Sequence, residues 1–109
     1  MTELEASRLV VAAIRRIHPT TLDSQIDEHA DHIERALART AFARCHWVRE
    51  LLFRYRGVQL GVRDDHVRFI TLVARASHYR LLDPRAAHVL DQLVIAGRGA
   101  AGAGAGMHG

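Results

Sequence analysis

Arginine and aromatic side chains alternate between residues 44 and 56, and they are the densest chemically versatile group in the chain. A guanidinium group binds carboxylates or phosphates through paired hydrogen bonds, and aromatic rings offer flat surfaces for packing or base stacking. Tryptophan, tyrosine and arginine also dominate the strongest contacts of protein–protein interfaces. The residues expected to contact a partner are Phe42, Trp47, Arg49, Phe53, Arg54, Tyr55 and Arg56.

This surface has two functional interpretations. In the first, the chain is a non-catalytic protein-interaction module, such as a small adaptor, inhibitor or assembly subunit, whose aromatic anchors and arginines bind a partner with an acidic surface. In the second, the same arginines bind nucleic acid without sequence preference. A structural alternative is that Trp47 and Tyr55 lie at the edge of the core with arginines packed over them. Nucleic acid is the less favoured partner.

The histidines and the cysteine do not predict an enzyme or a metal site. His29 and His32 have a spacing that could share a metal ion, but no second ligand pair with comparable spacing follows, and the HExxH order is missing. Cys45 and His46 are adjacent, so on a helix they point about 100° apart and cannot work together as nucleophile and base. The chain also lacks a phosphate-binding loop and a GxSxG motif. We expect no catalytic residue, no metal and no cofactor.

Composition predicts one domain. The chain has 109 residues, of which 49% are apolar and 25% charged, which is enough for one core and too apolar for general disorder. A single cysteine excludes an intrachain disulfide and favours the cytoplasm. No run of eighteen apolar residues is present, and the acidic start is unlike a signal peptide, so we expect no membrane association.

Charge is distributed unevenly. All fifteen basic residues are arginine. Residues 1–34 have seven acidic and three basic side chains, a net charge of −4, whereas residues 35–98 have five acidic and twelve basic ones, a net charge of +7. The two parts could attract each other within the fold, or the basic part could bind an acidic partner. Both interpretations stay open.

The elements that must position these side chains are helices. Capping signals and apolar steps of three or four predict an all-α bundle of about four helices. The predicted helices cover residues 2–18, 20–56, 64–79 and 83–97, with capping by Thr2, by Asp64 or Asp65, and by Asp83 before Pro84. The bundle domain is residues 1–96, and the Gly/Ala-rich residues 97–109 form a flexible tail.

The long second helix has apolar residues on two faces, so it is either central in the bundle or exposes one face to another chain. The second possibility predicts a homodimer. Arg44 falls on the main apolar stripe, which leaves a break between about residues 39 and 45 open. We expect a turn over residues 56–61, with Gly57 and Gly61 adopting positive φ angles. The third helix has only a narrow polar strip and is expected to be largely buried.

One segment resembles a known group of proteins. Residues 61–72, followed by Tyr79, by Asp83-Pro84 and by Val89-Leu90, resemble a small helical segment of bacterial proteins encoded beside type VI secretion components. The match covers about thirty residues, and Ala76-Ser77-His78 stand where that group carries a glycine. The resemblance implies an accessory or adaptor role without catalysis, and it supplies no catalytic residues.

Overall fold

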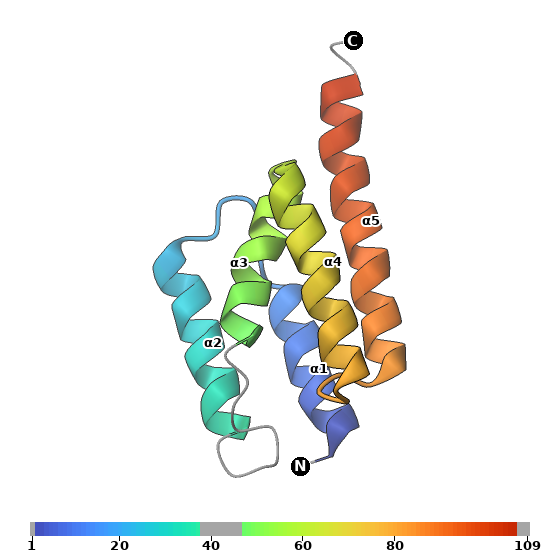
Figure 1. Cartoon of the computed structure of the whole chain (residues 1–109). Helices are drawn as coiled ribbons and strands as arrows, with labels where there is room; N and C mark the ends of the chain where they lie inside the picture. Colours follow the sequence, from blue (N-terminus) through green and yellow to red (C-terminus); the bar gives the residue numbers. More distant parts are fainter. Residues whose placement is uncertain (1, 38–46, 107–109) are drawn as a thin grey trace.

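Five α-helices form the part of the chain that the structure, a computed structural model, describes: residues 2–37 and 47–106, with side chains for 2–37 and 47–96. The helices are α1 (Glu3–Ile14), α2 (Asp23–Leu37), α3 (Trp47–Gln59), α4 (Arg63–His78) and α5 (Pro84–Gly106) (Figure 1). These ranges contain no β-strand. The predicted all-α class is confirmed, and the number of helices is five instead of about four.

The predicted long second helix is wrong. Its two halves are α2 and α3, which lie side by side and run in opposite directions (Figure 1). A single helix over residues 20–56 would be about 55 Å long and could not bury its stripe against a small core. Folding the halves together buries Ile26 and Ile33 of α2 beside Val48 and Leu52 of α3. The connection, with the suggested break, lies outside the described residues.

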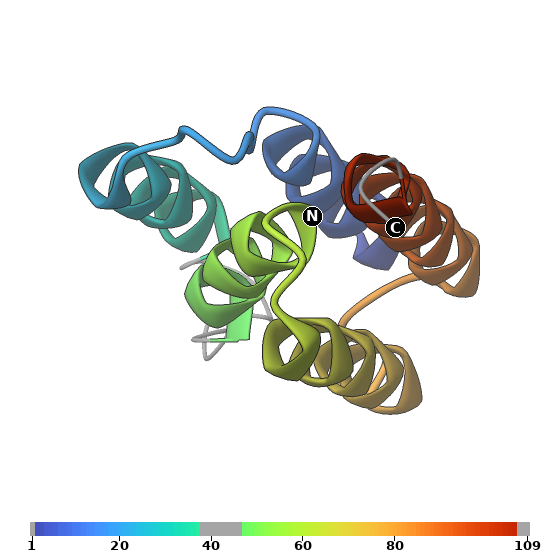
Figure 2. The same ribbon diagram turned by 90° about the horizontal axis from the view of Figure 1, so that it is seen from above.

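Helix α3 is the centre of the bundle. It contacts each of the other four helices, and Figure 2 shows it between α2 on one side and α4 on another, with α1 and α5 completing the ring. Its buried side chains, such as Leu51 and Val58, meet Phe69 of α4, Ile14 of α1 and Leu90 of α5 in one core. The sequence prediction of a central helix with apolar residues on two sides therefore applies to α3.

Two predicted helix starts are confirmed. The hydroxyl of Thr2 accepts a hydrogen bond from the backbone N–H of Glu5 at 3.1 Å and caps α1. At α5, the carboxylate of Asp83 accepts from the backbone N–H of Arg85 at 2.9 Å. Ser7, which is fully buried, accepts from the N–H of Asp83 at 2.8 Å and so fixes the start of α5 against α1.

The connection between α3 and α4 is shorter than predicted. Helix α3 continues to Gln59, so Gly57 lies inside it, and only Gly61 has a positive φ, of 78°. Helix α4 starts after Val62, which caps it without a side-chain hydrogen bond, so neither predicted aspartate is the cap. The missing Cβ of Gly57 makes room for Asp65, because an added Cβ would lie only 1.8 Å from its Oδ2 atom.

Helix α5 continues past the predicted end at residue 97. Its backbone is helical to Gly106, and this last part extends beyond the ends of the other helices (Figure 1). The last buried side chain described on α5 is Val94. The boundary between a domain of residues 1–96 and a flexible tail of residues 97–109 stays a prediction, since no side chain is described after Ala96.

Candidate functional site

The arginines of the predicted partner-binding surface lie on α3, and each is bound to carboxylates of its own chain. Arg49 points to α2, where its two terminal nitrogens lie 2.7 Å from Asp27, 2.5 Å from Asp31 and 3.6 Å from Glu34. The three acids follow one side of α2 at steps of four and three residues. One guanidinium group therefore offsets part of the repulsion among three neighbouring carboxylates.

Arg56 also binds the start of α2. Its guanidinium donates to the carbonyl oxygen of Thr21 and lies beside the Asp23 carboxylate, both at 2.7 Å. The guanidinium group also lies over the ring of Phe53, with 5.3 Å between the guanidinium carbon and the ring centre. This arrangement is a cation–π contact.

Arg54 joins α3 to α4 instead. It donates to Asp65 at 2.7 Å and lies 3.6 Å from Glu50. The hydrogen bond to Asp65 raises the pKa of Arg54, and the one to Asp31 likewise raises the pKa of Arg49. Both groups stay charged, and each is already paired.

These contacts favour the intramolecular interpretation of the uneven charge distribution. The acidic N-terminal part supplies Asp23, Asp27 and Asp31, and the basic part supplies Arg49 and Arg56, so the two attract each other across the α2–α3 contact. Both functional interpretations of the sequence need these guanidinium groups to be available to a partner. In the folded chain they are bound to acids that hold the helices together.

The aromatic anchors are only partly on the surface. Tyr55 is 5% exposed and packs on Phe69 with 5.5 Å between the ring centres, which corrects the prediction that its ring contacts a partner. Burial raises the pKa of Tyr55. Trp47 and Phe53 are half-buried against the core, as the structural alternative suggested for Trp47. Phe42 lies outside the described residues. A shallow hollow of about 430 Å³ remains where Phe53 is flanked by arginines.

Four of the six exposed Leu, Val and Ile side chains among the described residues lie elsewhere, on the α3–α4 turn and the outer side of α4, whereas Leu22 and Ile95 are exposed at other positions. Leu60 is 58% exposed, Val62 43%, Val67 55% and Ile70 42%. We call these four residues the turn surface. Val62 and Val67 line a hollow of about 580 Å³ beside the turn. The wall also includes His66, whose Nδ1 atom is buried without a hydrogen-bond partner among the described residues.

Helix α4 thus has two apolar sides. Phe69, Val73 and Ala76 enter the core, whereas Val67 and Ile70 lie on the opposite side with the exposed Ala74. The prediction that this helix is largely buried is wrong. Nine of its sixteen residues are polar, and the bundle covers only the side that carries Phe69, Val73 and Ala76.

The histidines are not gathered into a metal site within the described ranges, where no group of three His, Cys, Asp or Glu side chains could hold an ion. His29 and His32 both lie on α2. His78 makes an edge contact with Tyr79, with 5.1 Å between the ring centres. No helix in the part of the chain searched is long and apolar enough to cross a membrane.

Comparison of the chain with known protein families, curated proteins and solved structures finds no match. The resemblance to accessory proteins of type VI secretion clusters stays a prediction. In the part of the chain that the structure describes, the fold is an all-α bundle of five helices, and four of the six exposed Leu, Val and Ile side chains belong to the turn surface.

Proposed function

We propose that this chain is a non-catalytic protein-interaction module that binds its partner through the turn surface. The observation that carries the proposal is the second apolar side of α4, where Val67 and Ile70 recur at helical spacing and remain about half exposed. An apolar helix side that its own bundle leaves uncovered is the usual docking site for an apolar side of another helix. The partner expected here is a protein with an aliphatic helix.

Charge supports a partner that is also acidic. Arg63 lines the hollow beside the turn, and the described lining contains no carboxylate. Arg63 forms no ion pair with any residue whose side chain is described, so its guanidinium group is available beside the turn surface. An acidic partner would be attracted to such a surface before its apolar residues dock.

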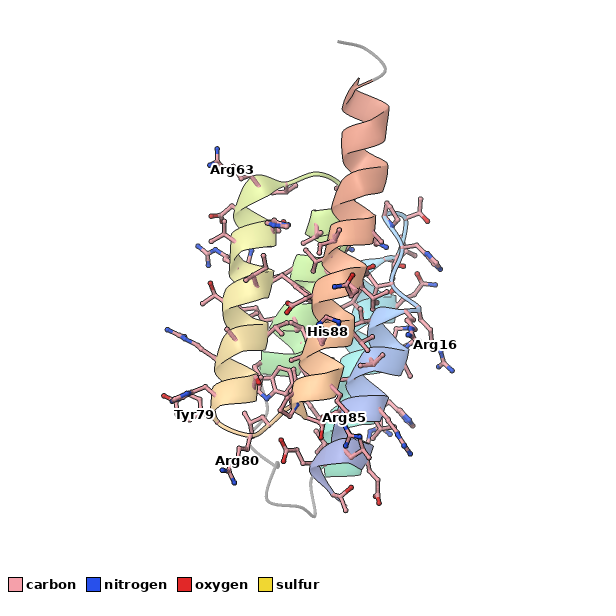
Figure 3. All side chains as sticks on the ribbon, turned by 90° about the vertical axis from the view of Figure 1, so that its right-hand side faces the viewer. Arg16, Arg63, Tyr79, Arg80, Arg85 and His88 are labelled. Atoms are coloured by element: carbon pink, nitrogen blue, oxygen red, sulfur yellow. The ribbon has the colours of Figure 1, made fainter. Side chains whose placement is uncertain are left out.

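The test replaces both aliphatic residues on α4 with glutamate. Val67→Glu/Ile70→Glu puts two charges where a partner would be apolar, and Tyr79→Glu, at the other end of α4 (Figure 3), is the matched exposed control. A photocrosslinking amino acid placed at Leu60 should capture a discrete protein in cell extract, with yields about tenfold lower in the double variant and unchanged in the control. Equal yields in all three proteins would contradict the proposal.

Light scattering on the same three proteins distinguishes a second copy of the chain from another protein. If the chain and the control are dimers and only the double variant is a monomer, the turn surface is the homodimer interface.

We also propose a cytoplasmic location, because one cysteine fits a reducing compartment, and the accessory role that the resemblance implies.

A further inference from the structure

A second surface lies on the opposite side of the bundle, in a groove between α1 and α5. The groove has a volume of about 300 Å³, and its floor is formed by the aliphatic side chains of Leu4, Val11 and Val89. Its rim carries Arg8 of α1, Arg15, which follows α1 as its C-cap in a helical conformation, and Arg85 of α5. Figure 3 shows Arg85 at the start of α5, next to α1.

The rim arginines differ from those on α3 because they are not held by acids across a helix contact. Arg8 and Arg15 are exposed and form no ion pair with any described residue. Arg85 has one neighbour, Asp83, at 3.3 Å, and its side chain is 82% exposed, which leaves terminal nitrogens free. The described lining of the groove contains no carboxylate. A ligand with negative charges and an apolar body would satisfy both parts of this site.

The spacing of the rim indicates the shape of the ligand. Arg8 and Arg15 are seven residues apart along α1 and its C-cap, so they project from the same side about 10 Å apart along the helix axis. The groove follows α1 from Leu4 to Arg15, which is about 16 Å or three helical turns. A helix lying in this groove would meet the two arginines with acidic residues that are also seven positions apart, and would place aliphatic residues on the floor between them.

We propose that the α1/α5 groove binds an acidic amphipathic helix of another protein, with two carboxylates seven residues apart on the guanidinium groups of Arg8 and Arg15. Single-stranded nucleic acid fits less well, because it binds through aromatic stacking and the floor is aliphatic. A flat membrane surface fits less well because the apolar residues lie in a concavity between charged side chains. This site is separate from the turn surface, so neither proposal depends on the other.

The experiment uses a fluorescein-labelled, capped helical peptide of about fourteen residues with leucines at steps of three and four and two glutamates seven positions apart. A second peptide has glutamine in place of both glutamates. Fluorescence anisotropy with the full chain should give a dissociation constant below about 1 mM for the acidic peptide and weaker binding, by about tenfold, for the glutamine peptide.

Variants of the protein locate the site. Arg8→Glu/Arg15→Glu should weaken the acidic peptide about tenfold or more, because both pairs become repulsive. Arg16→Glu is the matched control, since Arg16 projects from α1 away from α5 (Figure 3) and should change binding less than about twofold. Ala12→Phe fills the groove from an exposed lining position and should also abolish binding, without altering any charge.

Four outcomes would overturn the proposal. They are undetectable binding of the acidic peptide, equal affinity for both peptides, an equal effect of Arg16→Glu and the double variant, and normal binding by Ala12→Phe. Circular dichroism tests whether each variant is folded. If the charge-reversal variants do not fold, Ala12→Phe still tests the proposal.

Anionic vesicles and a short single-stranded DNA are further probes. Stronger binding of either than of the acidic peptide, with the same dependence on Arg8 and Arg15, would assign the groove to that ligand instead.

Discussion

At the scale of single residues, position decides what an arginine does. Arg49 and Arg8 are chemically identical, yet Arg49 lies between three carboxylates of α2, whereas Arg8 borders an apolar groove without an acid in its described lining. Arg49 was predicted to contact a partner because aromatic residues surround it in the sequence. The signal that could have identified Arg8 is its spacing of seven from Arg15, on the same side of the first helix as Leu4 and Val11.

The close packing of Gly57 against Asp65 predicts a cost for the smallest substitution at Gly57. In Gly57→Ala the new methyl group would lie 1.8 Å from Oδ2 of Asp65 and 2.6 Å from its Cβ, so rotation of the Asp65 side chain is not enough, α4 must move, and the contact of Asp65 with Arg54 must weaken. We expect the free energy of unfolding in urea to fall by about 1–3 kcal/mol.

The control for this prediction adds Asp65→Ala, which removes Oδ2 and Cγ of Asp65 and leaves its Cβ, 2.6 Å from the new methyl group. The double variant should then lose less stability than the sum of the two single variants, because the two shortest contacts exist only when both side chains are present. A Gly57→Ala protein as stable as the wild type would show that the helices are not packed this closely.

At the scale of elements, the sequence predicted the capped starts of α1 and α5, but it did not predict which side of each helix would be buried. Thr2 and Asp83 cap α1 and α5 through contacts within a few residues, which the sequence shows directly. The apolar periodicity of residues 20–56 predicted one continuous helix, whereas the chain reverses its direction between α2 and α3. The apolar residues on the outer side of α4 can be identified in the sequence, but their exposure depends on which side of α4 the other helices cover.

The start of α5 predicts a dependence of stability on pH. The N–H of Arg85 donates to the Asp83 carboxylate and lowers the pKa of that group below its usual value of about 3.9. A carboxyl whose pKa is lower in the folded than in the unfolded chain stabilises the fold above the unfolded pKa, and this contribution disappears as the pH falls through the folded pKa.

Asp83→Asn keeps an oxygen acceptor but does not titrate. The free energy of unfolding lost in this variant should be greatest near neutral pH and should shrink as the pH falls below about 4. Urea unfolding at several pH values measures it. Asp91→Asn, an exposed position on the same helix, is the matched control. A loss in Asp83→Asn that stays constant over this range would exclude the charge of Asp83 as the cause.

At the scale of the whole molecule, the core and the two candidate surfaces belong to residues before 97. Val94, 1% exposed, is the last buried side chain described. A chain ending at Ala96 should therefore unfold with a free energy within about 0.5 kcal/mol of the full chain. Ending at Leu93 removes Val94 and should cost about 1.5 kcal/mol or more. A large loss in the longer truncation would mean that the Gly/Ala segment belongs to the domain.

The two candidate surfaces lie on different parts of the bundle. The turn surface is formed by the α3–α4 turn and α4, and the groove by α1 and α5, so two partners could bind to one bundle without sharing a residue. The adaptor role stays a proposal: the arginine and aromatic residues and the resemblance first suggested it, and the surfaces proposed here use other residues than those that the sequence favoured.

The sequence by itself determined the helical class and the starts of α1 and α5, because capping and apolar periodicity depend on neighbours within a few positions. Only the tertiary structure decided that the chain turns back between α2 and α3, that the arginines at 49, 54 and 56 meet acids of their own chain, and that the outer side of α4 stays uncovered. These outcomes depend on contacts between residues far apart in sequence, and a periodic pattern does not say which helix will cover which side.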